Sequence, residues 1–338
     1  MALKPPVEVP QGAIRLNTDS QKLEFYAQDQ WWEMATEVAA PIGGRYLMGG
    51  GWTSPADTNV ISYVNTSTRG NAVDFGDLMR DQRHSAALAS NTRGIFVGGY
   101  KTSSSGNNAI TYVTISTAGN AGDFGDTLQG SSQAWSYGTC ANQTRGIMAG
   151  SVGETNVIQY ITISSTGNAT DFGDTLAVAR DLFGCATPTR GVFAGGSPSN
   201  NNVMQYITLA SEGNSLDFGD LTNNSLQNAT YNKPAASNGV IGLFGPGGGI
   251  NIERVTMTTL GNAQEFASSN VFTTSALSTP GSGDKLNMFF GSGRYSTTLV
   301  NTIETVSFTT GGKAVDFGDA TGATESPGAC CNAHGGLG

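Results

Sequence analysis

The sequence predicts an all-β protein in which one four-stranded unit recurs six times. A phenylalanine returns at intervals of 46 to 51 residues along the 338-residue chain, as Phe75, Phe124, Phe172, Phe218, Phe266 and Phe317. The segments between these positions are short runs rich in β-branched and aromatic residues, separated by Gly and Asn turns. A period near 50 in such a chain is typical of a β-propeller, because one four-stranded sheet cannot bury both faces without neighbours.

The composition favours many short strands joined by turns. Glycine accounts for 47 residues, charged residues for 13% and apolar residues for 38%. The net charge of −9 argues against nucleic acid as a partner, since phosphate binding needs clustered Lys and Arg. No apolar run reaches the roughly 20 residues of a membrane span, so we expect no membrane insertion. The Met-Ala-Leu-Lys-Pro-Pro start lacks the apolar segment of a signal peptide, which favours folding in a cytoplasm.

The segment from Ser85 to Leu128 illustrates one repeat. A strand of small residues is followed by a Thr-Arg-Gly turn, a buried strand and an alternating strand. A Gly-Asn turn then leads into the outer strand with Asp-Phe-Gly-Asp. The four strands are expected at 85–89, 95–97, 109–116 and 121–127.

The first repeat lacks its first strand. Residues 43–77 supply three strands, and the small-residue segment Gly328–Ala333 at the other end of the chain fits the missing position. We therefore expect this segment to pair with Tyr46–Met48, which leaves no free sheet edge in the circle. The predicted domains are an N-terminal β module at 1–40 and a six-bladed propeller at 41–338.

The repeated phenylalanine is expected to fill the wedge between neighbouring sheets, with the flanking acids accepting hydrogen bonds from turn amides. Calcium coordination by paired acids such as Asp74 and Asp77 is an alternative, although the fifth repeat keeps Phe266 and lacks the second acid. A kinase-type role for Asp-Phe-Gly is excluded, because the triplet occurs five times without the other kinase motifs. No cofactor and no metal are expected. The four cysteines match no zinc spacing. We expect small buried side chains at Cys140 and Cys185, and half-buried packing for the vicinal pair Cys330 and Cys331.

The N-terminal module is predicted to be two strands around an Asn17–Ser20 turn, with a third strand at 30–34. Such a hairpin is too small to be stable alone. It carries more apolar surface than it can bury by itself, and we expect it to pack on a partner or on its own propeller. Its apolar residues are Ile14, Leu16, Leu23, Phe25, Tyr26, Trp31 and Trp32.

Two resemblances follow from these motifs. The double glycine after the second strand (Gly98-Gly99), the tyrosine of the third (Tyr112) and the period near 50 resemble kelch repeats, with Phe in place of the outer-strand Trp. The fuller phrase, from Thr-Arg-Gly to Gly-Asn-Ala-x-Asp-Phe-Gly-Asp, is similar to repeats in virion and tail-fibre proteins of marine cyanophages. The segment Gln11–Met34, with its Ile-Arg-Leu-Asn-Thr-Asp run, resembles a short module of phage tail fibres.

Binding residues are expected on the loops that differ between repeats, because those loops share one face of the ring. Six side chains are the candidates for contacts with a glycan or protein: Trp52, Arg83, Tyr100, Trp135, Tyr137 and Tyr295. Catalytic constellations are missing from the sequence, so no enzyme is expected. His84 is expected in a turn or at a solvent-facing position and not as a catalytic base. The enzymatic alternative is a glycan-degrading propeller whose catalytic acids are scattered along the sequence.

The resemblances imply a phage virion structural protein, assembled in the host cytoplasm and located in the virion. They favour a tail-fibre or receptor-binding component that docks on other virion proteins through its N-terminus and presents a propeller face to host glycan or protein. A capsid decoration or tail nozzle protein is one alternative, and a carbohydrate-binding or glycan-degrading propeller is another. A homo-oligomer is expected, with three copies by analogy to fibres.

Overall fold

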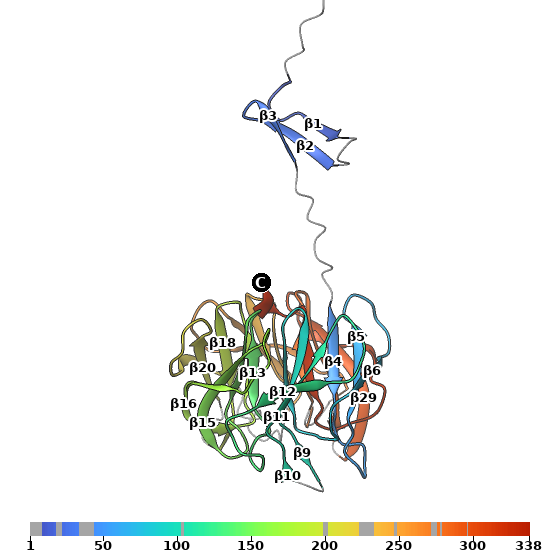
Figure 1. Cartoon of the computed structure of the whole chain (residues 1–338), viewed down its shortest axis with the longest axis vertical. Coiled ribbons are helices and arrows are strands. Elements are labelled where there is room, and N and C mark those ends of the chain that lie inside the picture. Colours follow the sequence, from blue (N-terminus) through green and yellow to red (C-terminus); the bar gives the residue numbers. More distant parts are fainter. Residues whose placement is uncertain are drawn as a thin grey trace, which may run out of the picture. The chain divides into compact units, whose positions relative to one another are not determined.

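The computed structural model describes residues 9–17, 22–33, 44–102, 105–198, 202–222, 233–246, 249–271, 276–277, 279–295 and 297–338. The chain divides into two compact units, Met1–Ile42 and Gly43–Gly338. The predicted all-β fold is confirmed, since the described residues form strands and a short 3-10 helix, η2 (Gly335–Leu337) (Figure 1). Within the described part, no helix is long and apolar enough to span a membrane.

The first unit contains one antiparallel sheet of three strands, in the order β1-β2-β3. Ile14 lies opposite Phe25, and Phe25 lies opposite Trp32, so these three side chains share one face of the sheet. The strands are β1 (Ile14–Asn17), β2 (Lys22–Ala27) and β3 (Gln30–Glu33).

The second unit contains six sheets of four or five strands, which we number sheet 1 to sheet 6. Sheet 1 consists of β32 (Gly328–Cys331), β4 (Arg45–Gly49), β5 (Val60–Asn65) and β6 (Val73–Asp77). Sheet 2 consists of β7 (Ala86–Ala89), β8 (Arg93–Val97), β11 (Ala109–Thr114) and β12 (Gly122–Asp126). Sheet 3 consists of β13 (Gly138–Ala141), β14 (Arg145–Ala149), β15 (Thr155–Thr162), β16 (Thr170–Arg180) and β19 (Ser197–Pro198).

The remaining three sheets repeat this pattern. Sheet 4 consists of β17 (Phe183–Ala186), β18 (Arg190–Ala194), β20 (Val203–Thr208) and β21 (Leu216–Asp220). Sheet 5 consists of β22 (Ala235–Ser237), β23 (Ile241–Phe244), β24 (Asn251–Thr256), β25 (Gln264–Ser268) and β30 (Gly312–Lys313). Sheet 6 consists of β26 (Ala276–Leu277), β27 (Gly281–Gly283), β28 (Asn287–Tyr295), β29 (Thr298–Ser307) and β31 (Val315–Asp319). A separate two-stranded antiparallel sheet consists of β9 (Tyr100–Lys101) and β10 (Ser105–Gly106).

The two ends of the second unit meet in sheet 1. The C-terminal strand β32 pairs with β4, with Ala329 opposite Met48 and Cys331 opposite Tyr46. The sequence-based prediction of this pairing is confirmed. The small side chains of β32 suit it to a position that is buried throughout.

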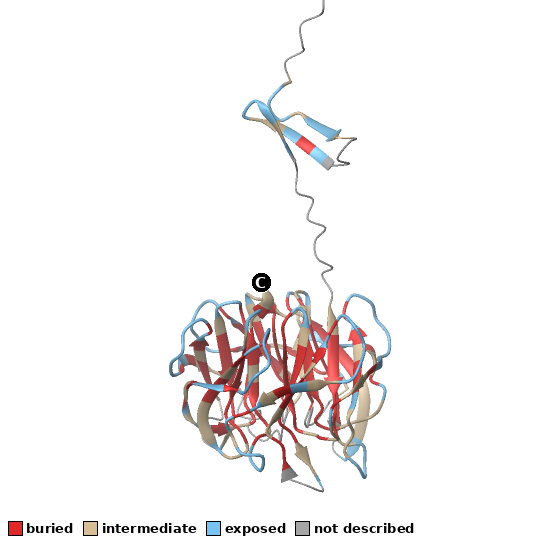
Figure 2. Cartoon of the chain, viewed as in Figure 1, coloured by how far each residue is buried: buried red, intermediate tan, exposed pale blue. Residues whose placement is uncertain are grey.

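Each repeated phenylalanine lies in an apolar cluster that joins its own sheet to the next one. Phe124 of sheet 2, for example, packs with Met148 and Ile161 of sheet 3, and Phe317 of sheet 6 packs with Tyr46 of sheet 1. Burial is therefore concentrated in the strands of this unit (Figure 2). Five of the six rings are at most 6% exposed, whereas Phe266 is only partly buried.

The Gly-Asn-Ala turn of one sheet is hydrogen-bonded to the outer strand of the preceding sheet. The Phe124 carbonyl accepts from Gly167 N at 2.7 Å, and Asn168 Oδ1 accepts from Asp126 N at 3.0 Å. The second acid takes part through its backbone amide, which donates to the asparagine side chain. The sequence-based prediction instead had the acid side chains as the acceptors. We call this set of bonds the intersheet latch.

Candidate functional site

Four of the six predicted loop residues lie together in one cluster, which we call the loop cluster: Trp52, Arg83, Tyr100 and Trp135. The Arg83 Cζ lies 5.3 Å from the Tyr100 ring centroid and 5.8 Å from that of Trp52. The centroids of Tyr100 and Trp135 are 5.4 Å apart. All four side chains are partly exposed, so the cluster offers aromatic surface and a cation to a partner.

The backbone holds the loop cluster in place. Arg83 and Tyr100 exchange two backbone hydrogen bonds of 2.9 and 2.7 Å. The backbone of Trp52 forms bridges with Asp57 and with Glu325, which precedes β32. Residues from three loops and from the C-terminal region are thus fixed relative to one another, which reduces the entropy lost when a ligand binds.

Acidic residues that the sequence did not single out form ion pairs in and beside the loop cluster. The Asp57 side chain is 3% exposed, its Oδ1 lies 3.7 Å from Arg83 Nε, and its Oδ2 accepts from Thr102 N at 2.8 Å. Lys101 Nζ lies 3.0 Å from Asp81 Oδ2. Arg294 Nη1 lies 3.4 Å from Glu325 Oε2. Single acids in loops carry no local sequence signal, so only the three-dimensional arrangement identifies them.

His84 lies beneath the loop cluster. Its ring stacks on Trp135 with centroids 5.2 Å apart and an interplanar angle of 28°. The residue is only 5% exposed, so the solvent-facing interpretation is wrong, while its φ of 56° fits the turn interpretation. Burial, with the nearby charges of Arg83 and Arg294, lowers the pKa of His84 to about 3. The imidazole is therefore neutral at physiological pH and supports Trp135 as a flat, uncharged ring.

Two predicted loop residues are not part of the observed loop cluster. Tyr137 is 5% exposed and packs in the apolar cluster between sheets 2 and 3. Its hydroxyl lies 3.1 Å from Gln129 Oε1, so the prediction of a surface contact is wrong for this residue. The backbone of Tyr295 ends β28, and its side chain lies outside the described residues.

The sheet of the first unit has two chemically different faces. One face carries five large apolar side chains, which are 36% to 64% exposed: Ile14, Leu16, Leu23, Phe25 and Trp32. On the other face, Glu24 binds Arg15 at 2.7 Å and Asn17 at 2.8 Å, and Tyr26 contacts the edge of Trp31. Tyr26 and Trp31 therefore do not belong to the exposed apolar face, which we call the module face and define by the other five residues.

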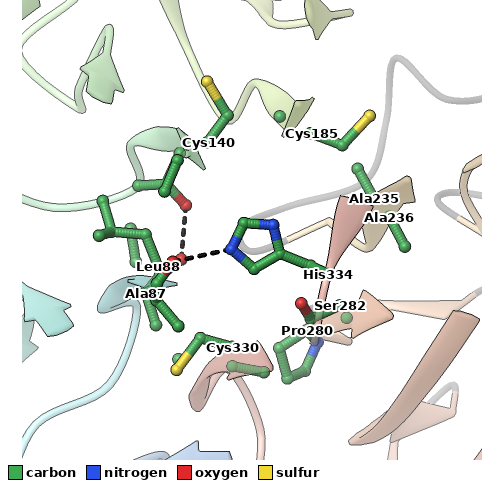
Figure 3. Close-up of a pocket in the computed structure, with 18 of the residues that line it drawn as sticks. Ala87, Leu88, Cys140, Cys185, Ala235, Ala236, Pro280, Ser282, Cys330 and His334 are labelled. Carbon is green, nitrogen blue, oxygen red and sulfur yellow. Dashed lines mark hydrogen bonds between the residues drawn. The ribbon is translucent and has the colours of Figure 1, made fainter. Parts of the chain in front are cut away.

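The first strands of the six sheets surround a pocket of about 70 Å³. Figure 3 shows the His334 ring in its centre, while the thiols of Cys140, Cys185 and Cys330 point away from the ring. His334 Nδ1 accepts from Gly336 N at 3.1 Å, so Nε2 donates to the Ala89 carbonyl at 2.7 Å. Burial lowers the pKa of His334 to about 4. The expected burial of Cys140 and Cys185 is confirmed, whereas Cys330 and Cys331 are fully buried and not half-buried as predicted.

The described residues contain no group of three or more His, Cys, Asp or Glu side chains that could hold a metal ion. No protein-family model matches the sequence, and no curated protein matches it. In the loop cluster, the rings of Trp52 and Tyr100 lie near a guanidinium, and the Trp135 ring packs on Tyr100. This arrangement is suited to binding the face of a sugar ring or an exposed protein side chain.

Proposed function

We propose that this chain is a phage virion structural protein that binds a host surface glycan or protein through its loop cluster. In this proposal the second unit is a six-bladed, kelch-like β-propeller in which sheets 1 to 6 are the blades. The protein is assembled in the host cytoplasm and functions in the virion, as part of a tail fibre or another surface-exposed adhesion component.

The contacts between the sheets support the propeller. Six apolar clusters each join one sheet to the next, and the last of them joins sheet 6 to sheet 1. The intersheet latch also connects sheet 6 with sheet 1, since Asn71 Oδ1 accepts from Asp319 N at 3.1 Å. The first strands of all six sheets line a single pocket.

The observation that carries the adhesion proposal is the convergence of Trp52, Arg83, Tyr100 and Trp135. Aromatic residues and arginine contribute most of the binding energy at many interfaces. They also stand on loops over a rigid sheet scaffold, where binding residues are concentrated in many folds. The Asp57 carboxylate is held by Arg83 and by the Thr102 amide, so we propose binding without catalysis.

A binding experiment tests this proposal. The purified protein is titrated onto host cells and onto extracted host surface polysaccharide, together with Trp52→Ala and Trp135→Ala variants. We expect at least tenfold weaker binding for each variant. The control is Val240→Ala, because Val240 is 56% exposed and lies just before β23 in sheet 5, at the strand ends opposite the loop cluster. Equal binding by wild type and both variants, or release of sugars by the wild type, would contradict the proposal.

A capsid decoration or tail nozzle role is the second candidate, and the module face favours it. Five exposed apolar side chains on one sheet face need a covering surface, and other virion proteins or further copies of the chain would supply it. Locating the protein in a whole-virion reconstruction separates the two candidates, because an adhesion component presents the loop cluster outwards and a nozzle protein buries it between virion subunits.

A further inference from the structure

An arginine–tyrosine pair occupies the same place in sheets 1 to 4, next to the following sheet. The arginine begins the second strand, and its Cζ lies 4.6 to 4.7 Å from the ring centroid of a tyrosine in the third strand. Its Nη1 donates to a carbonyl just after the third strand of the next sheet, at 2.6 to 2.9 Å. The four pairs are Arg45–Tyr63, Arg93–Tyr112, Arg145–Tyr160 and Arg190–Tyr206.

Sheet 6 has small residues at both of these positions. Asn287 stands in the position of the arginine. It is the first residue of β28 and pairs with Ser307, just as Arg93 is the first residue of β8 and pairs with Thr114. Thr305 lies opposite Phe289, in the register of the tyrosines. A pocket of about 360 Å³ is present where sheets 1 to 4 carry the pair, and it lies between sheet 6 and sheet 1.

Sheet 5 differs from sheet 6 in this respect. In sheet 5, Ile241 stands at the position of the arginine, and Arg254 stands at the position of the tyrosine. The Arg254 Cζ lies 5.1 Å from the Phe266 ring centroid, so a large side chain still covers the repeated phenylalanine. In sheet 6 the residue in that register is Thr305, and Phe317 lines the pocket.

The pocket is basic and rich in hydroxyl groups. Among the described residues that line it, only Arg69 and Lys313 are charged, in a chain with 26 acidic and 17 basic residues. Both are exposed, and neither forms an ion pair with a described residue. Hydroxyl groups come from both sheets and from the segment before β31: Thr66, Ser67, Thr305, Ser307 and Thr310.

We propose that this pocket binds one acidic sugar residue, with its carboxylate between Arg69 and Lys313. The Ser67 and Thr310 hydroxyls and the Asn287 amide would pair with the sugar hydroxyls. The hydroxyls of Thr66, Thr305 and Ser307 already form hydrogen bonds within the protein. The pocket volume falls in the range of small-ligand sites. The pocket lies at the strand ends opposite the loop cluster, because it includes Asn287 at the start of β28. It is thus a second binding site, independent of the loop cluster.

Calorimetric titration with methyl glucuronide tests the proposal, with methyl glucoside as the neutral counterpart and inorganic sulfate as the bare anion. We expect binding of the glucuronide that is at least tenfold tighter than that of either other probe. Arg69→Gln and Lys313→Gln should each weaken it about two- to fivefold, as expected for exposed charge pairs. Lys101→Gln, which removes one positive charge elsewhere, should leave it unchanged.

The double variant Asn287→Arg/Thr305→Tyr rebuilds the pair of sheets 1 to 4 and should abolish glucuronide binding. Trp135→Ala should retain it, which distinguishes this site from the loop cluster. The proposal is overturned if all three probes bind alike, if sulfate binds as tightly as the glucuronide, or if the glucuronide does not bind. Thermal unfolding of every variant verifies that it is folded, and the two single glutamine variants remain informative if the double variant does not fold.

Discussion

Arg93 stacks on Tyr112, with its Cζ 4.7 Å from the ring centroid, and its Nη1 donates to the Ile163 carbonyl of the next sheet at 2.8 Å. Tyr112 in turn meets Phe124 edge to face. One planar cation therefore connects the aromatic pair of its own sheet to the backbone of the neighbouring sheet. A guanidinium suits this position because it can stack and donate at the same time.

Replacing Arg93 with lysine should destabilise the protein by about 1 to 2 kcal/mol, because the ammonium loses the stacked geometry and the directed hydrogen bond. The free energy of unfolding in urea measures the effect. Arg69→Lys is the matched control, since Arg69 is exposed and forms no ion pair with a described residue, and it should change stability by less than about 0.5 kcal/mol. Equal stabilities of the two variants would contradict the role assigned to Arg93.

Gly125→Ala should be more damaging, at about 2 to 4 kcal/mol. Gly125 has a φ of 150°, and an added Cβ would lie 2.4 Å from the Gly167 carbonyl oxygen in the intersheet latch. In sheet 5, Ala267 occupies the position that corresponds to Gly125. Ala267 pairs there with the parallel strand β30. Ala267→Gly is therefore the control, with a cost of about 1 to 2 kcal/mol from chain entropy and the loss of one buried methyl group. Denaturant titration of both variants checks the difference.

The sequence predicts the strands and the pairing of β32 with β4 because both depend on local patterns of small, β-branched and turn residues. It does not predict what the Thr-Arg-Gly turn does. Arg93 looks like a solvent-exposed turn residue in sequence, yet its carbonyl partner lies 70 residues further along the chain. The glycine of Asp-Phe-Gly-Asp is equally ambiguous, because the turn it contacts belongs to the next repeat.

The loop cluster could be predicted in part. Trp52, Arg83, Tyr100 and Trp135 come together because variable loops of successive repeats emerge at the same strand ends. Tyr137 is buried although it lies only two residues after Trp135. It directly precedes β13, and its side chain packs between sheets 2 and 3. His84 is missed as a support for Trp135, since nothing local in the sequence reports ring stacking between two loops.

Stability should fall in mild acid because the pKa of His84 is lowered to about 3 in the folded protein. The unfolded chain takes up a proton near pH 6.5, and the folded protein does not until much lower pH. The neutral histidine thus contributes its full stability above pH 6.5, and this is lost as pH falls from 6.5 towards 3. At pH 4.5 we expect a loss of roughly 2 to 3 kcal/mol from this residue.

Urea unfolding of wild type and His84→Asn at pH 7.5 and 4.5 measures this effect. The variant lacks the titrating group, so its stability should depend less on pH by the same roughly 2 to 3 kcal/mol. His334, with its pKa lowered to about 4, is expected to produce the acid sensitivity that remains in the variant. Identical pH dependence of the two proteins would show that His84 is accessible to protons in the folded state.

Leu16→Asp should disrupt the association that the module face is proposed to mediate. Leu16 is 60% exposed on a face with four other apolar side chains, so a carboxylate there must be desolvated when the face is covered. Light scattering after size-exclusion chromatography should show oligomers of the wild type and monomers of the variant. Val73→Asp is the control, because Val73 is 51% exposed in the second unit and should leave association unchanged. A wild type that is monomeric at all concentrations would contradict self-association through this face and would indicate that a different protein covers it.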